Sequence, residues 1–200
     1  MLPIGHLGIT LGTVKLLDVA RTGWYHHPAI SNKRAEQSSN TSQSRTSLLS
    51  KVDVRFLLLG SILPDIIDKP MGRVFFQDTF SNGRIFCHTL LFLIIIAVAG
   101  FLLYRCRNKT WLLVISFGVL MHLVLDEMWL QPHTLLWPLY GWAFPKSDID
   151  DYARHMLDEL ASNPTVYIPE IIGALFLIWA GVLLVHRKRV HKFIKTGLMY

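Results

Sequence analysis

Residues 87–104, CHTLLFLIIIAVAGFLLY, form the apolar stretch that decides the fold class of this chain. Two further stretches, 110–129 and 168–185, are similarly apolar, and each is close to the roughly 20 residues with which an α-helix crosses a bilayer. The 200-residue chain is 52% apolar and 17% charged, whereas soluble domains have about 25% charged residues. The sequence therefore predicts an all-α polytopic bundle, a single integral membrane domain over residues 1–200.

Two other segments are marginal as membrane spans. Residues 2–20 carry three ionisable side chains, and residues 54–67 are short. Such segments insert when their polar positions face protein or water instead of lipid. Counting both, we expect about five membrane-inserted helices. Residues 31–51, between the two segments, are rich in Ser, Asn and Gln without an apolar period, which predicts a flexible loop.

The basic residues predict how the bundle is oriented. Five crossings place residues 21–53, 105–109 and the tail 186–200 on one side, where they hold thirteen Lys and Arg, against five on the other side. Basic loops stay in the cytoplasm, so we expect a cytoplasmic loop, a basic cytoplasmic tail and a cell-membrane protein. The net charge of +6 does not indicate nucleic-acid binding, because no aromatic-interleaved basic face is present.

This topology brings six ionisable residues to one depth near the outer interface. Ionisable groups at membrane depth are costly and normally face a bundle interior or a water-filled cavity. Six of them at one level predict a functional site that faces outside. The six, contributed by four helices, are His6, Asp65, Asp68, His88, His122 and Asp126.

The spacing of these residues indicates metal binding. His122 and Asp126 share a helix face at i, i+4, and Asp65 and Asp68 at i, i+3 can share an ion or bridge two. Imidazole and carboxylate suit Zn²⁺, Mn²⁺ or Fe²⁺. Six ligands suffice for one or two metal ions. Two metal ions about 3.5–4 Å apart are typical of enzymes that hydrolyse phosphoesters. An ion or proton pathway and a buried polar network remain alternatives.

Several short motifs also carry a family resemblance. They are GHLG (5–8), LLLGSILPDIIDKP (57–70), GRIFCHTLLF (83–92), GVLMHLVLDEMW (118–129) and LLWPLYGWAF (135–144). In this order, over about residues 4–145, the chain resembles the LexA-binding, inner-membrane-associated hydrolases, also described as membrane-bound metal-dependent hydrolases. The resemblance implies metal dependence and points to the same six residues.

The chain departs from the family pattern in two places. The family's D-x-D pair is one residue wider here, as Asp65-Ile66-Ile67-Asp68, and Gly83 stands where the family has a His. Arg84 follows at its family position, where it matches a phosphate bidentately or anchors lipid headgroups. A weaker likeness in the H-x-x-x-D pattern, to zinc-dependent phospholipase C, favours a phosphoester by analogy.

We therefore expect a membrane-bound hydrolase that acts on an ester or phosphoester of a lipid or lipid-linked substrate through metal-activated water. Asp65 or Asp68 is the expected shared ligand and base, and Arg84 is expected to stabilise the anion. Zn²⁺ is the expected ion, with Mn²⁺ or Fe²⁺ as alternatives. A membrane ion- or metal-binding or transport module with the same His/Asp cluster, and a structural protein with a decayed site, stay open. Membrane lipids, and not nucleic acid, are the expected partners.

Overall fold

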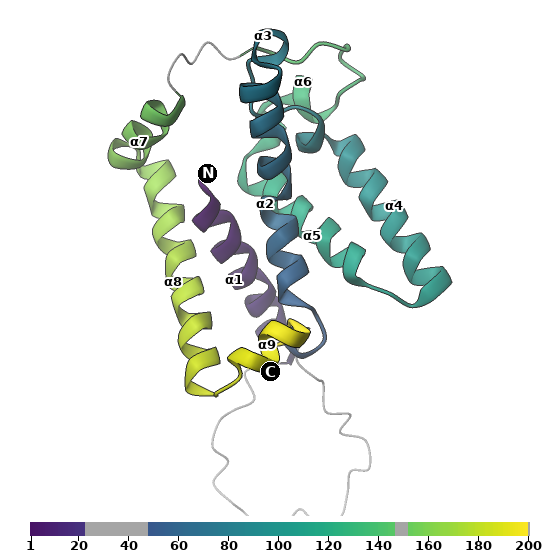
Figure 1. Ribbon diagram of the computed structural model, residues 1–200, viewed down its shortest axis with the longest axis vertical. Coiled ribbons are helices and arrows are strands. Elements are labelled where there is room, and N and C mark those ends of the chain that lie inside the picture. The colour runs from purple at the N-terminus through teal and green to yellow at the C-terminus, as the bar shows by residue number, and fades with distance from the viewer. Residues whose placement is uncertain (23–47, 147–151, 200) are drawn as a thin grey trace, which may run out of the picture.

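The computed structural model describes residues 1–22, 48–146 and 152–199 (Figure 1). Within these ranges all regular secondary structure is helical, which confirms the all-α prediction. Most of the loop predicted at 31–51 lies outside the described residues. In chain order the elements are α1 (Pro3–Thr22), η1 (Leu48–Ser50), α2 (Val54–Pro70), η2 (Met71–Phe75), α3 (Gln77–Phe80), η3 (Phe86–His88), α4 (Leu90–Arg107), α5 (Trp111–Leu125), η4 (Met128–Leu130), α6 (Pro132–Leu135), α7 (Tyr152–Ser162), α8 (Pro164–His186) and α9 (Val190–Thr196).

Two of the described helices, α4 and α8, are long and apolar enough to cross a membrane. The apolar segment predicted at 110–129 forms a shorter helix, α5, of 15 residues. At 1.5 Å per residue it is about 22 Å long, less than the roughly 30 Å of a bilayer core. The helix stops because Glu127, just beyond it, adopts a left-handed backbone with φ 52°. The number of five inserted helices stays a prediction.

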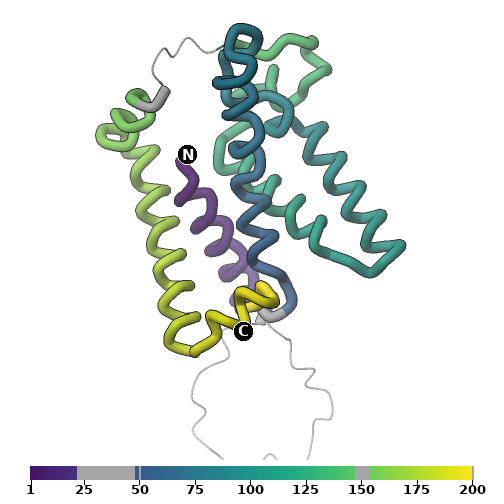
Figure 2. Tube along the Cα trace, in the orientation of Figure 1, coloured from purple at the N-terminus to yellow at the C-terminus, as the bar shows by residue number. Residues whose placement is uncertain are grey.

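The helix ends that carry the predicted site residues lie in one half of the bundle. Figure 2 shows that the start of α1, the end of α2, the end of α5 and the start of α8 lie toward the same end, away from α9. The start of α4 lies there too, because α4 and α5 form an antiparallel pair joined by a short turn. This alternation of direction brings residues far apart in sequence to one level.

Glycines allow the helices to cross closely. A Cβ atom on Gly118 of α5 would lie 2.6 Å from the carbonyl oxygen of Leu57 in α2, and one on Gly60 would overlap the carbonyl of Ile115. The same holds where α1 meets α8, since a Cβ on Gly8 would overlap the backbone of Gly173. Small residues at such contacts are typical of packed membrane helices. The α2–α5 crossing places the two main ligand-bearing helices backbone to backbone.

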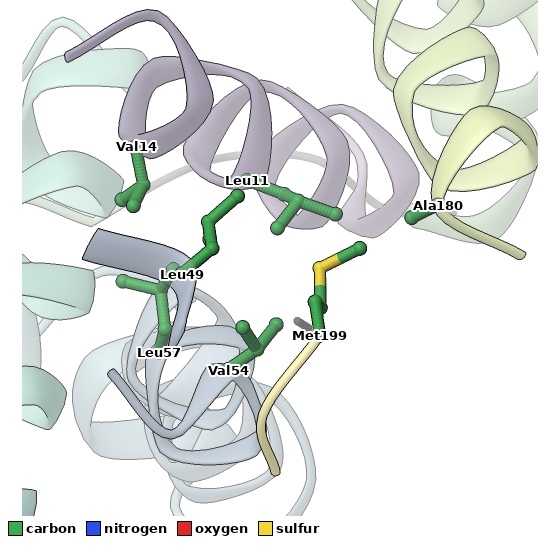
Figure 3. Packing of buried hydrophobic residues seen from close by; sticks show 7 residues of the cluster. All are labelled: Leu11, Val14, Leu49, Val54, Leu57, Ala180 and Met199. Atoms are coloured by element: carbon green, nitrogen blue, oxygen red, sulfur yellow. The ribbon is translucent and has the colours of Figure 1, made fainter. Parts of the chain in front are cut away.

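The main apolar cluster lies at the opposite end of the bundle from these polar ends. Figure 3 shows its residues, which come from α1, η1, α2, α8 and the C-terminal segment: Leu11, Val14, Leu49, Val54, Leu57, Ala180 and Met199. The C-terminal segment is held there by backbone hydrogen bonds, from Val54 N to Gly197 O at 2.9 Å and from Met199 N to Leu49 O at 3.3 Å. The predicted basic tail therefore folds back against the bundle.

Candidate metal centre

Four of the six predicted site residues converge at the polar end of the bundle. Asp65 comes from α2, His88 ends η3, His122 lies in the last turn of α5, and Asp126 directly follows that helix. Each offers one ligand atom, and the four atoms all lie within 4.8 Å of one another. All four side chains are buried. A set of two imidazoles and two carboxylates at this separation can hold one divalent ion.

Hydrogen bonds orient both imidazole rings toward this point. The Nδ1 atom of His88 lies 2.7 Å from a carboxylate oxygen of Asp68, and Nδ1 of His122 lies 2.8 Å from the backbone carbonyl oxygen of Ser61. A carbonyl only accepts, so Nδ1 of His122 carries the proton, and Nε2 keeps a lone pair. The two Nε2 atoms face each other at 3.2 Å. Metal-ligating imidazoles are commonly oriented in this way by a carboxylate or carbonyl.

An unpaired carboxylate oxygen completes the convergence. The Oδ1 atom of Asp65 is buried without a hydrogen-bond donor, 3.6 Å from Nε2 of His88 and 3.9 Å from Nε2 of His122. Its other oxygen, Oδ2, accepts a hydrogen bond from Nζ of Lys69 at 2.7 Å. Buried acceptors without a donor are rare and require an explanation. A cation between Oδ1 and the two imidazoles supplies one, so these residues fit a metal ion.

His6 and Arg84 flank the fourth ligand. One oxygen of Asp126, Oδ1, lies 3.1 Å from Nε2 of His6 and 2.9 Å from the N-terminal amine, although the His6 contact lacks hydrogen-bond geometry. The other, Oδ2, accepts a 2.9 Å hydrogen bond from Nε of Arg84 and forms an ion pair with its Nη2 atom, also at 2.9 Å. The His6 ring also stacks on His122, with centroids 4.2 Å apart. His6 therefore borders the group from α1 but is not one of the four converging ligands.

The local charges shift the pKa values of Asp126 and His88, which lie outside the long helices. Burial alone would raise the pKa of Asp126, but His6, Arg84 and the N-terminal amine hold it well below the ordinary range. Burial would lower the pKa of His88, yet the adjacent carboxylates of Asp65 and Asp68 raise it. Both shifts have one cause, which is that opposite charges are concentrated in a buried space.

Asp68, which is predicted as a ligand and base, makes its contacts with the η3 segment. Its carboxylate accepts hydrogen bonds from the backbone N–H groups of Ile85, Cys87 and His88, at 2.9 to 3.2 Å, in addition to the His88 ring. Asp68 is not one of the four residues whose ligand atoms lie within 4.8 Å of one another. Asp68 therefore holds the η3 turn and fixes the His88 ring.

Gly83 also has a clear place. It lies outside the ligand group, and a Cβ atom there would come within 3.0 Å of Nε of Arg73 and 3.2 Å of Cγ of Lys69.

The contact between the Ser61 carbonyl and His122 was not predicted from the sequence. A backbone acceptor leaves no side-chain signal, and only the helix crossing brings it to His122.

Glu170 secures the position of His6. Its carboxylate, buried on α8, accepts hydrogen bonds from the backbone N–H groups of Leu2 at 2.7 Å and Gly5 at 2.8 Å. The first N–H groups of a helix have no partner within it, so this carboxylate stabilises the start of α1. It thereby fixes the turn from which His6 reaches Asp126.

Comparison with known proteins identifies the family of this chain. A search of curated proteins and a search of solved structures gave no match. A family model described as "YdjM inner membrane protein" matches residues 1–192, which include all four residues of the candidate metal centre. The chain therefore belongs to the YdjM inner membrane protein family, the LexA-binding, inner-membrane-associated hydrolases that its motifs resemble.

Proposed function

We propose that this chain is a membrane-bound metal-dependent hydrolase that cleaves an ester or phosphoester in a lipid or lipid-linked substrate. The observation that carries the proposal is the convergence of His88 Nε2, His122 Nε2 and Asp65 Oδ1 on one buried point. When both rings are neutral and carry their proton on Nδ1, these three atoms are all acceptors, which matches a cation site. The family description supports hydrolysis as the reaction class.

Asp65, His88, His122 and Asp126 would hold the ion. Imidazole and carboxylate ligands suit Zn²⁺ first, with Mn²⁺ and Fe²⁺ as alternatives, and four ligand atoms this close fit one ion. A bound divalent ion supplies Lewis-acid polarisation and lowers the pKa of water. The proposal requires neither a second ion nor a direct contact from Asp68.

The surrounding residues have separate tasks. Asp68 and the Ser61 carbonyl hold the two imidazole rings, so that both Nε2 atoms stay directed at the ion. Asp65 is the carboxylate that faces the centre through its Oδ1 atom, and it would serve as the shared ligand and general base. Arg84 is half-buried beside Asp126 and presents its guanidinium to an anionic substrate.

The position of the centre favours an enzyme over a transport module. Transporter sites usually lie near the bilayer midplane, whereas this cluster lies at one end of the bundle. The exposed apolar side chains of α4 and α8 are suited to lipid contact on the flanks. With the cytoplasmic C-terminus that the basic residues predict, the centre opens at the outer face, where lipid headgroups lie.

Activity of the purified full-length protein in detergent tests this function. Phosphate monoesters, phosphate diesters and carboxylic esters of lipids should be offered with Zn²⁺, Mn²⁺ or Fe²⁺. We expect metal-dependent turnover of at least one class, abolished by His122→Ala and retained by His133→Ala, which changes an exposed His outside the centre. Equal turnover by the two variants, or turnover that survives a chelator, would contradict the proposal.

A further inference from the structure

A cleft of about 530 Å³ opens beside the metal centre. Arg84 and Asp126 belong to its lining, so the cleft and the centre share a wall. Its size falls within the roughly 300–1,000 Å³ range of small-ligand sites. The opposite wall comes from α7 and the start of α8, through His155, Glu159 and Val166.

The cleft is lined by more cations than anions. Four basic side chains reach it from separate segments, namely α2, η2, the segment before η3 and the segment after α6: Lys69, Arg73, Arg84 and Lys146. The lining contains two carboxylates, and both are already engaged, as are two of the cations, since Lys69 bonds to Asp65 and Arg84 bonds to Asp126. Asp126 is bound by Arg84, and Glu159 accepts a hydrogen bond from Asn163 at 2.7 Å. An ion at the metal centre would add further positive charge at the same wall.

Hydrogen bonds connect the segment that carries Arg84 with the segment that carries Lys146. The side-chain amide of Asn82 donates to the Pro145 carbonyl at 2.7 Å, and its Oδ1 accepts from the Arg84 backbone N–H at 3.0 Å. The Nζ atom of Lys146 donates to the Asp78 carbonyl at 2.9 Å. The segment that carries Lys146 is therefore hydrogen-bonded to the segment that carries Arg84. A positive wall that is held in place before binding loses less entropy when a ligand arrives.

Gly83 keeps the space between two of these cations open. A Cβ atom at this position would press on Arg73 Nε and Lys69 Cγ, at 3.0 and 3.2 Å. Gly83, which replaces the His of the family pattern, therefore lines the cleft. It does not belong to the four ligands of the centre.

From these contacts we infer that the cleft binds the phosphate or diphosphate group of an anionic ligand. A phosphate group carries up to two negative charges and several acceptor oxygens, which suits cations converging from four segments better than a neutral ester or a single carboxylate does. Arginine adds a planar pair of donors, and lysine adds a point charge. The inference rests on the proposed function for the chemistry after binding, but not for the binding itself.

Binding is measured by isothermal titration calorimetry on the full chain in detergent, with a chelator present so that no metal contributes. Inorganic pyrophosphate is the soluble probe, and phosphatidate in mixed micelles, compared with phosphatidylcholine, is the lipid probe. We expect Arg73→Gln and Lys146→Gln each to raise the Kd roughly tenfold or more, as loss of a charged hydrogen bond does. Lys109→Gln, an exposed basic residue in the α4–α5 turn, is the matched control and should leave Kd unchanged.

The two probes distinguish the source of the phosphate. Binding of pyrophosphate indicates a soluble or exposed phosphate group, and binding of phosphatidate micelles alone indicates a lipid headgroup. The inference is overturned if neither probe binds, or if both folded cleft variants bind as the Lys109→Gln control does. His122→Ala should retain anion binding in chelator, so a failure of the metal proposal and a failure of this one give different results.

Discussion

The Nε2 atoms of His88 and His122 face each other at 3.2 Å, although the two residues are 34 positions apart in the chain. Each ring is held from behind, His88 by the Asp68 carboxylate and His122 by the Ser61 carbonyl. Two buried nitrogen atoms directed at one point, with an unpaired carboxylate oxygen beside them, form a group that could hold a shared cation.

Replacing Asp68 should weaken metal binding without removing a ligand. Asp68→Ala frees the His88 ring and leaves three backbone N–H groups of the η3 segment without their acceptor. We expect metal affinity to fall roughly 10- to 100-fold, the usual effect of losing a residue that orients a metal-ligating His. Competition with a metal-indicator dye measures it. The exposed Asp158→Ala is the control, and equal affinities in the two variants would contradict the orienting role.

The α2–α5 crossing should not tolerate a side chain at its glycines. Gly118→Val places carbon atoms against the Leu57 carbonyl, which lies 2.6 Å from even a Cβ atom. Such overpacking costs about 1–3 kcal/mol, and it also separates the Ser61 carbonyl from His122. We expect a lower thermal midpoint in detergent together with weaker metal binding.

The matched control for this crossing is Gly181→Ala on α8. A Cβ atom there has no neighbour within 4 Å, and alanine favours a helix over glycine by roughly 0.5–1 kcal/mol. This variant should be as stable as the wild type or slightly more stable. A Gly118→Val protein with wild-type stability would show that the helices do not cross as described.

Arg84 should matter for turnover more than for metal content. Its guanidinium contacts one oxygen of Asp126 and also lines the cleft, so Arg84→Gln removes a donor from the substrate and leaves the four ligands in place. We expect kcat/KM to fall roughly 100-fold, as for loss of an anion-stabilising donor, with the ion still bound. Arg84→Lys keeps the positive charge but loses the planar pair of guanidinium donors, so it should restore only part of the activity. Full activity in Arg84→Gln would contradict this role.

The two native cysteines allow a test of the orientation. Cys106 is exposed near the end of α4, on the side that the basic residues predict to be cytoplasmic, and Cys87 is buried. A membrane-impermeant maleimide should therefore label Cys106 only after cell lysis. In a Cys106→Ser background, Asp158→Cys on α7 should label in intact cells. The reverse pattern would place the metal centre on the cytoplasmic side.

The sequence predicted much of the fold because apolar runs and basic loops are local signals. The segments that form α4 and α8 are continuous and apolar, and both are helices long enough to span. The end of α5 could not be predicted, because it depends on the left-handed backbone of Glu127.

The sequence predicted which residues come together better than it predicted their contacts. Asp65, His88, His122 and Asp126 converge as the topology suggested, and His6 lies beside them. Asp68 could not be separated from Asp65 by spacing alone, since its contacts are backbone N–H groups 17 to 20 residues away. The charged cleft could not be anticipated either, because its cations come from four separate segments.

Metal content is the most direct test of the central claim. The full-length protein, purified without chelator and then loaded and desalted, should contain about one divalent ion per chain by elemental analysis, as a single four-ligand centre requires. The double variant His122→Ala with Asp126→Ala should contain none, and His133→Ala should match the wild type. A wild-type protein that holds no ion and cannot be loaded with Zn²⁺, Mn²⁺ or Fe²⁺ would contradict the account.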